Sequence, residues 1–293
     1  MNKNDIIIIG AGPAGISAAL QLRKFGLNPL IIEMGSVGGL LRNANKIENY
    51  PGFPGGISGL DLSELFKEQL DKAGLVVNNQ EVQTLDYKDD TFFVKTTGGE
   101  YTCKYVFIAT GTVPKKLTNL NLLENFGKIY YDVSSFESTT GKKFYVIGSG
   151  DIAFDYALTL SRKNDVTILN RGMKIKANIL LEKEVLESKI SYFENSDILK
   201  VTDVSDGLSL DLSSSGTEKS VKTDYLVIAV GRIPAKGFYS NLLVSMELEL
   251  FKAGRLYLIG DVTNSSFRQA AIAAGDGVKA VMRFNEKIVL VQE

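Results

Sequence analysis

The sequence predicts an α/β fold made of two similar open-sheet domains, one of which is inserted into the other. The chain has 293 residues, enough for about two domains of average size. A pattern of strand, glycine-rich turn, helix and strand occurs at the N-terminus and again from residue 144. Each copy is followed by a further apolar strand, so we expect both copies to share one plan.

The first copy begins with four isoleucines at residues 6–9, a β-branched run typical of a buried parallel strand. The turn at residues 10–15 reads GAGPAG. Apolar residues at helical spacing predict a helix over 16–25, and residues 29–32 predict a second strand that ends at Glu33. The strand that closes this copy is expected at 105–111.

The turn has the G-x-G-x-x-G form of a Rossmann-like dinucleotide site. Gly10 permits the tight turn, Gly12 lets a pyrophosphate approach the backbone, and Gly15 lets helix and strand pack closely. The N-terminus of the helix offers unpaired N–H groups to the phosphates. Glu33, 18 residues after Gly15, is placed to bond a ribose 2′-hydroxyl.

The second copy has strands at 144–147 and 166–169, the turn GSGDIA at 148–153, a helix at 154–162 and a closing strand at 225–231. Arg171 stands where the first copy has Glu33. An arginine there can pair with a 2′-phosphate, and Lys174 and Lys176 add positive charge, so we predict NADP(H) at this site. NAD(H) is the alternative if Arg171 is only a solvated surface residue, because Gly172 leaves no second adjacent arginine.

The C-terminal part indicates which nucleotide the first copy takes. Residues 256–261 read LYLIGD, a strand ending in Gly-Asp, and residues 266–271 read SFRQAA and open a helix of small residues. This pair resembles the second flavin motif of the flavoprotein reductases with two dinucleotide domains, which implies FAD at the first site. A helix N-terminus facing the flavin favours negative charge on the reduced cofactor.

Nearly the whole chain resembles thioredoxin reductase and its relatives. The loop segments GGLL at 38–41 and IENYPGFP at 47–54, the segment ATG at 109–111 and the segment RQA at 268–270 carry the resemblance. Leu40 stands in place of the glutamine usual in that loop. The resemblance implies FAD contacts from Gly10, Gly12, Pro13, Ala14, Gly15, Glu33, Gly39, Leu40, Leu41, Asn49, Ala109, Thr110, Gly111, Asp261, Gln269 and Ala270, with Val82 reaching the adenine through its backbone. The NAD(P)H contacts would be Gly148, Gly150, Asp151, Ile152, Ala153, Arg171, Lys176 and Gly231.

The chain departs from thioredoxin reductase at the redox-active dithiol. That family has a Cys-x-x-Cys pair just before its second glycine turn, whereas residues 127–135 read GKIYYDVSS. The one cysteine, Cys103, precedes the strand expected at 105–111, and we expect it to be a buried packing thiol. Residues 130–133 and 148–157 instead are similar to the thioredoxin-reductase-like ferredoxin–NADP reductases.

Composition excludes several classes of chemistry. The chain has no histidine, and one cysteine cannot form an internal dithiol, so we expect no protein catalytic residue and no metal site. The net charge of −1 gives no electrostatic case for nucleic acid. No apolar run approaches the ~20 residues that span a bilayer, and we expect a cytoplasmic protein without a membrane partner.

The domain order follows from the resemblance. The FAD-binding domain is expected to be split into residues 1–112 and 241–293, with the NAD(P)H-binding domain at 113–240 inserted between them. A polar stretch over 205–220 with alternating Leu208, Leu210 and Leu212 predicts a hairpin in the second domain. A homodimer is expected from the resemblance alone.

The resemblance implies a FAD-dependent NAD(P)H oxidoreductase that passes electrons to an external acceptor, with ferredoxin or a similar carrier as the first expectation. Three alternatives stay open. They are small acceptors such as oxygen or a quinone, disulfide reduction with thiols borrowed from a partner, and a non-catalytic FAD-binding protein.

Overall fold

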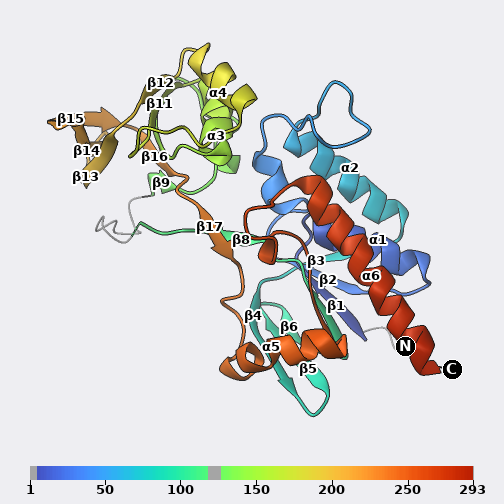
Figure 1. The fold of residues 1–293 in the computed structure, drawn as a ribbon. Coiled ribbons are helices and arrows are strands. Elements are labelled where there is room, and N and C mark those ends of the chain that lie inside the picture. The colour runs from blue at the N-terminus through green and yellow to red at the C-terminus, as the bar shows by residue number, and fades with distance from the viewer. Residues whose placement is uncertain (1–4, 118–126, 293) are drawn as a thin grey trace. The chain divides into compact units, whose positions relative to one another are not determined.

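The structure, a computed structural model, describes residues 5–117 and 127–292 (Figure 1). These residues belong to two compact units. Unit 1 contains residues up to 42, 46–113 and those from 233 onward, and unit 2 contains 43–45 and 114–232. The chain passes between the units at 113/114 and 232/233, where the predicted borders were 112/113 and 240/241. The second crossing lies earlier because Phe238 O and the N–H of Ser240 both bond to the backbone of Leu85 in unit 1.

The core of unit 1 is a five-stranded parallel sheet with α1 (Pro13–Lys24) and α6 (Ala270–Gln292) against it. Ile6 and Ile8 belong to the apolar cluster shared with these helices, whereas Ile7 and Ile9 point to the other face. All four are buried, as expected of a central parallel strand. The strand order is β18 (Leu256–Leu258), β7 (Tyr105–Ile108), β1 (Ile6–Ile9), β2 (Leu30–Glu33) and β3 (Val77–Asn79).

The other face of this sheet is covered by elements that the sequence analysis did not predict. They form a second apolar cluster in which Leu85, Phe92 and Leu243 pack with Ile7 and Ile9. Leu85 and Phe92 come from an antiparallel three-stranded sheet, and Leu243 comes from a helix. The elements are β4 (Val82–Lys88), β5 (Thr91–Thr96), β6 (Gly99–Cys103) and α5 (Asn241–Ala253), and α2 (Gly59–Lys72) completes the unit.

Unit 2 contains a second five-stranded parallel sheet. Its strand order is β12 (Ser191–Phe193), β11 (Asp165–Leu169), β10 (Lys143–Ile147), β16 (Tyr225–Ile228) and β9 (Ile129–Tyr130), with helices α3 (Asp151–Ser161) and α4 (Ile179–Leu186). The hairpin predicted over 205–220 is part of a three-stranded antiparallel sheet in which Leu208, Leu210 and Leu212 are buried. Its strands are β13 (Ser196–Val204), β14 (Gly207–Ser214) and β15 (Thr217–Thr223).

The short elements lie in the connections. Two of them, β8 (Thr112–Pro114) and β17 (Arg232–Pro234), pair with each other where the chain passes between the units. The single-turn helices are η1 (Gly39–Asn43), η2 (Ser134–Phe136) and η3 (Gly260–Val262).

The two parallel sheets have the same plan. The central strand, β1 or β10, is paired on one side with the next strand of its copy and on the other with the closing strand, β7 or β16. The strand order therefore reverses at β1 and at β10, and ligands of open α/β sheets bind at the carboxyl end of such a strand. This confirms the predicted α/β fold with two Rossmann-like domains.

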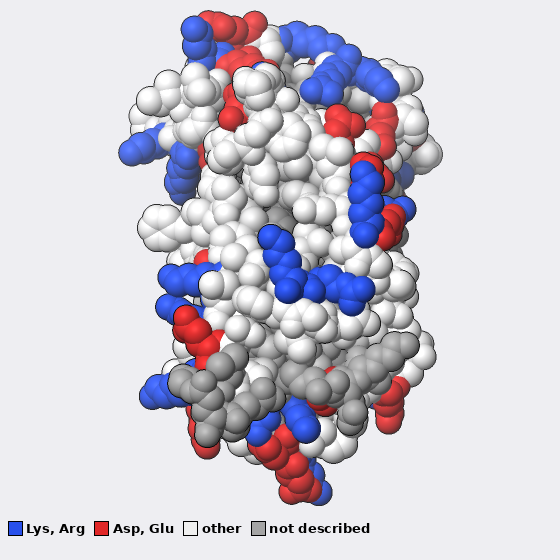
Figure 2. Space-filling model, turned by 90° about the vertical axis from the view of Figure 1, so that its right-hand side faces the viewer, with Lys and Arg blue, Asp and Glu red and all other residues white. Residues whose placement is uncertain are grey.

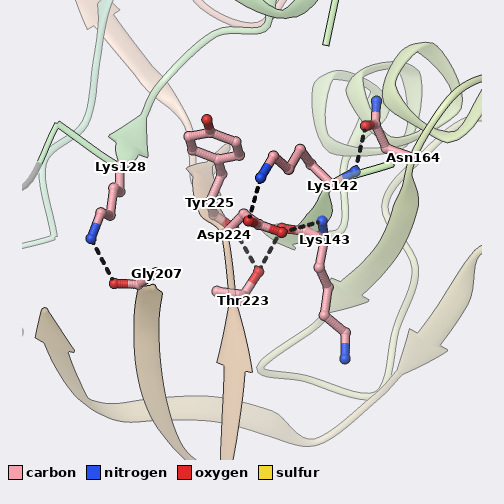
Figure 3. A network of polar contacts seen from close by, with 8 residues as sticks. All are labelled: Lys128, Lys142, Lys143, Asn164, Gly207, Thr223, Asp224 and Tyr225. Atoms are coloured by element: carbon pink, nitrogen blue, oxygen red, sulfur yellow. Dashed lines mark hydrogen bonds and ion pairs between the residues drawn. The ribbon is translucent and has the colours of Figure 1, made fainter. Parts of the chain in front are cut away.

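A polar network ties the opposite, amino ends of β10 and β16 together (Figure 3). The Asp224 carboxylate accepts from the backbone N–H of Lys143 at 2.8 Å and from Lys142 Nζ at 3.1 Å. Nearby, Lys128 Nζ donates to Gly207 O at 2.9 Å, which fixes the turn between β13 and β14. These contacts stabilise the sheet at the end away from its glycine turn.

Charge is mixed on the surface. Basic and acidic side chains lie interspersed on the face drawn in Figure 2, with apolar and neutral residues between them. Within the described ranges, no helix is both long and apolar enough to cross a bilayer. The same residues contain no group of three or more carboxylate or thiol side chains placed to hold a metal ion.

Candidate dinucleotide-binding sites

The glycine turn of unit 1 is shaped by backbone contacts that only glycine allows. Gly10 has a φ of +105°, and a Cβ added there would lie 2.4 Å from the carbonyl oxygen of Ala109 at the end of β7. A Cβ added at Gly15 would lie 1.9 Å from Gly10 O, so the helix can approach the strand only with glycine at this position. These contacts support the roles predicted for Gly10 and Gly15.

The helices that follow the two glycine turns differ from α2, α4 and α5 at their N-termini. Ser58, Asn178 and Ser240 cap α2, α4 and α5 by accepting hydrogen bonds from backbone N–H groups with their side chains. The caps of α1 and α3 are Gly12 and Gly150, which have no side chain to accept such bonds. The first-turn N–H groups of α1, at Ala14 and Gly15, and of α3, at Asp151 to Ala153, are thus without a side-chain cap and suit a phosphate-binding helix.

Glu33 lies at the carboxyl end of β2 and holds the turn in shape. Its Oε2 accepts from the N–H of Ala11 at 2.7 Å and its Oε1 accepts from the N–H of Gly35 at 2.8 Å. A carboxylate oxygen has a second acceptor site, so each oxygen can still accept from a ribose hydroxyl. The ribose contact was predictable from the sequence, whereas the two backbone bonds were not.

The loop after β2 returns to the glycine turn. The N–H of Gly38 donates to Ala11 O at 2.8 Å, which places Gly39, Leu40 and Leu41 of η1 beside the turn. Leu40 is 40% exposed, and its apolar side chain cannot make the hydrogen bond of the glutamine it replaces.

Asn49 and Gln269, 220 positions apart, come together in unit 1. Asn49 Nδ2 donates to Gln269 Oε1 at 2.9 Å, and Gln269 immediately precedes Ala270, the first residue of α6. Asp261 lies in η3 next to Gly260, where an added Cβ would lie 2.8 Å from the Cβ of Ala14 in α1. Gln269 and Gly260, from the C-terminal part of the chain, therefore lie against Asn49 and Ala14, from the N-terminal part.

The remaining predicted residues of unit 1 are Ala109, Thr110, Gly111 and Val82. Ala109 contacts Gly10, Thr110 Oγ1 donates to Ala235 O at 2.7 Å, and Gly111 has a φ of +62°. Val82 lies two residues after Gln80, whose N–H donates to Glu33 O at 2.9 Å, so this backbone bond brings the start of β4 near the end of β2.

These residues fit FAD by geometry and by donor chemistry. Gly10 and Gly15 have no room for a side chain, so the backbone of the turn is open to a ligand. The N–H groups at the start of α1 have no side-chain cap, and the Glu33 carboxylate can accept a further hydrogen bond from a ribose. We assign the turn, Glu33, the η1 loop, Asn49, Asp261 and Gln269 as candidate FAD contacts.

Unit 2 has a glycine turn of the same kind, but Arg171 stands where unit 1 has Glu33. Gly148 has a φ of +150°, and a Cβ added there would lie 2.5 Å from Ala229 O, the counterpart of the Gly10 contact. Gly231, with a φ of +120°, follows the closing strand as Gly111 does in unit 1. Asp151 Oδ1 accepts from the N–H of Asn178 at 2.7 Å, while Ile152 is 38% exposed and Ala153 is fully buried.

The basic loop of residues 171–176 follows β11 in unit 2. The side chains of Arg171, Lys174 and Lys176 are exposed, and none of them makes an ion pair with a carboxylate of the described chain. The N–H of Lys176 donates to Ser149 O at 2.7 Å, so the loop is bonded to the glycine turn. These cations fit a 2′-phosphate beside the turn, and these residues fit NADP(H).

Cys103 has the environment of a packing thiol. It is 4% exposed at the end of β6, and burial raises the pKa of its thiol to about 12. A thiol with such a pKa has almost no reactive thiolate at neutral pH.

Asp155 is a titratable residue whose environment the sequence analysis missed. It lies in α3, where burial raises the pKa of its carboxyl to about 6 although the N–H of Asn45 donates to it at 3.1 Å. The signal in the sequence was its position one turn after Asp151, on the first turns of the helix that follows the glycine turn.

A comparison with protein families matches residues 4–277 to the pyridine nucleotide-disulphide oxidoreductase model. The thioredoxin reductase of Bacillus subtilis (strain 168) is 30% identical over 99% of this chain and 96% of its own length. The bifunctional thioredoxin reductase/thioredoxin of Mycobacterium leprae is 29% identical, and this chain spans 64% of its length.

Solved structures agree with these relatives. The Lactococcus lactis thioredoxin reductase in its FR conformation superposes with a TM-score of 0.85 at 27% identity, covering 98% of this chain and 99% of that one. A bacillithiol disulfide reductase from Staphylococcus aureus has the same fold, with a TM-score of 0.77 at 21% identity over 98% of this chain and 99% of its own. Thioredoxin reductases use FAD and NADPH, so the predicted cofactors are confirmed at the level of the family.

Proposed function

Because the chain belongs to the pyridine nucleotide-disulphide oxidoreductase family, we propose that it is a FAD-dependent NAD(P)H oxidoreductase that passes electrons to an external acceptor. One observation carries the proposal. Two helix N-termini without side-chain caps follow the central strands of the two parallel sheets, where the strand order reverses. Glu33 follows the first of these helices and Arg171 follows the second.

We assign FAD to unit 1 and NADP(H) to unit 2. When bound, the flavin supplies hydride acceptance from the nicotinamide and onward electron transfer. The chain supplies binding and orientation: Glu33 would hold the ribose of the flavin nucleotide, and Arg171 with Lys176 would hold the 2′-phosphate of the other. No side chain needs to act as an acid or base in hydride transfer.

The acceptor we propose first is ferredoxin or a similar carrier. The support is the similarity of residues 130–133 and 148–157 to the ferredoxin–NADP reductases, together with the single, buried cysteine. A carrier of this kind docks on basic residues. Of the candidates Arg23, Lys24, Lys115, Lys116, Lys142 and Lys143, Lys142 is paired with Asp224 at 3.1 Å.

A second candidate is reduction of a disulfide with thiols that a partner provides. It is favoured by the names of the similar proteins, which are thioredoxin reductases and bacillithiol disulfide reductases. Small acceptors such as oxygen or a quinone, and a non-catalytic FAD-binding role, are further possible outcomes of the same test. A homodimer and a cytoplasmic location remain predictions.

One panel of assays separates these functions. Purified protein is given NADPH and then ferredoxin, menadione, oxygen, or thioredoxin with a disulfide, and NADPH oxidation is followed at each step. Fast reduction of ferredoxin alone supports the first candidate. Reduction of a disulfide acceptor at a higher rate than ferredoxin supports the second. Failure to oxidise NADPH with any acceptor contradicts an enzymatic role.

The nucleotide assignment is tested at Arg171. A charge-assisted contact to the 2′-phosphate is worth roughly 1.5–3 kcal/mol, so Arg171→Ala should raise the Kd for NADPH about ten- to a hundredfold. The Kd for NADH should change little. Lys200→Ala, which removes an exposed cation on β13 of the same unit, is the matched control. Equal affinity of the unmodified protein for both nucleotides contradicts the assignment.

A further inference from the structure

Asn170 occupies the junction between β11 and the basic loop of residues 171–176. It is only 4% exposed, although it carries a polar amide. Its backbone is fixed on both sides, because its N–H donates to Phe193 O at 2.9 Å and its carbonyl accepts from the N–H of Ser196 at 2.9 Å. The side chain therefore projects from a rigid point of unit 2.

The amide of Asn170 makes three hydrogen bonds, and two of them are to the loop. Its Oδ1 accepts from the N–H of Gly172 at 3.0 Å, and its Nδ2 donates to the carbonyl of Lys174 at 3.2 Å. A backbone N–H can only donate and a carbonyl can only accept, so these two partners fix which end of the amide is which. Its second N–H donates to the hydroxyl of Tyr192 on β12 at 2.8 Å.

The loop is attached at its far end as well. Lys176 and Ala177 both donate backbone N–H bonds to Ser149 O, at 2.7 and 2.9 Å. Asn170 thus holds residues 172 and 174, and the glycine turn holds residues 176 and 177. The loop carries three cations whose mutual repulsion opposes a compact shape, so bonds that hold it folded before a ligand arrives reduce the entropy lost on binding.

We infer that Asn170 is a positioning residue, which keeps the basic loop in the conformation that receives the 2′-phosphate of NADP(H). The inference rests on the proposed function, since it assigns to Arg171 and its neighbours the phosphate contact proposed above. Asn170 itself is buried beneath the loop and touches no phosphate. It acts on affinity for the phosphate through the geometry of the exposed cations.

Asn164 provides a matched control within the same unit. It is 5% exposed and also makes three side-chain bonds, accepting from the N–H of Lys142 and donating to Thr139 O and Leu160 O. It lies just before β11, at the opposite end of that strand from Asn170, and its bond to Lys142 is drawn in Figure 3. Asn164→Ala and Asn170→Ala therefore remove the same chemistry at the two ends of one strand.

The experiment measures Kd values of the flavin-loaded protein for NADP⁺, NAD⁺ and adenosine 2′-phosphate by isothermal titration calorimetry. We expect Asn170→Ala to raise the Kd for NADP⁺ and for adenosine 2′-phosphate about five- to twentyfold and that for NAD⁺ less than twofold. Asn164→Ala should leave the ratio of the NADP⁺ and NAD⁺ constants unchanged. In an Arg171→Ala background, Asn170→Ala should have little further effect, because the contact that it positions is gone.

A milder variant keeps the test decisive if Asn170→Ala does not fold. Tyr192→Phe removes only the hydroxyl that supports the amide, and it should raise the Kd for NADP⁺ about two- to fivefold. An unchanged preference for NADP⁺ in both variants, or equal weakening of NADP⁺ and NAD⁺, overturns the inference while the nucleotide assignment stands. An unmodified protein without preference for NADP⁺ overturns the assignment and this inference together.

Discussion

Replacing Glu33 by alanine removes a carboxylate that serves the backbone and, in the proposed function, the FAD ribose. Both oxygens accept backbone N–H bonds, from Ala11 and from Gly35. A hydrogen bond to a charged group contributes about 1.5–3 kcal/mol. Because Glu33 is only partly buried, we take the lower end, about 3 kcal/mol for the two bonds together.

This loss can be measured as a shift in thermal unfolding. In a protein of this size 1 kcal/mol corresponds to about 2 °C, so Glu33→Ala should lower Tm by about 6 °C. Glu33→Gln keeps one acceptor and should lower Tm by about half as much. Glu33→Ala should also release FAD on dilution, with a Kd at least about tenfold higher, because the ribose loses an ionised acceptor.

The assay is scanning calorimetry of the flavin-loaded proteins with fluorescence of released flavin. Glu100→Ala is the control, because Glu100 is exposed on β6 of the same unit. A Glu33→Ala variant that keeps its FAD and unfolds within about 1 °C of the unmodified protein would refute the reasoning.

Three further predictions concern titratable groups. Native Cys103 should react with a thiol reagent only as fast as the protein unfolds, and Cys103→Ser should leave NADPH oxidation unchanged, because burial raises its thiol pKa to about 12; fast labelling would contradict this. Burial raises the pKa of Asp155 from 3.8 to about 6, so the folded protein binds this proton more tightly than the unfolded chain does. The resulting stabilisation is complete below pH 3.8 and is lost as the pH rises through 6. Asp155→Asn should therefore raise the free energy of unfolding at pH 8 by up to about 3 kcal/mol and have no such effect at pH 3.5, measured by urea titration. The pKa of Asp224 is lowered, although its burial acts the other way, because the bonds from Lys143 and Lys142 outweigh that cost. Asp224→Asn should destabilise by about 1 kcal/mol at pH 7 and by progressively less as pH falls below 4, and an effect independent of pH would contradict it.

The parts of the fold that local chemistry determines were predictable from the sequence. The strand at 6–9 has the predicted bounds, because four β-branched residues between a polar start and a glycine leave little choice. The closing strands were predicted to 111 and 231 but end at Ile108 and Ile228. After these residues each chain segment leaves its sheet and passes the glycine turn. Ala109 contacts Gly10 in unit 1, and Ala229 contacts Gly148 in unit 2.

Other parts depend on tertiary contacts that no short pattern shows. The sheet β4–β6 is amphipathic, and its buried face is completed by α5, more than 130 residues later in the chain. The Asn49–Gln269 bond joins residues that were predicted as separate contacts to one ligand. Asn170 looks like an ordinary turn residue in the sequence, and only its burial and its three bonds show that it holds the loop.

The two parallel sheets differ in which part of the chain supplies their fifth strand, and this difference has a consequence for synthesis on the ribosome. The outer strand beside β16 is β9, which precedes the other strands of unit 2, so all five are made once residue 228 has been translated. The outer strand beside β7 is β18, Leu256–Leu258, which is made after the whole of unit 2. Domains tend to fold in the order of their completion. The inserted unit can therefore complete its sheet first, while the unit that begins the chain waits for its last strand.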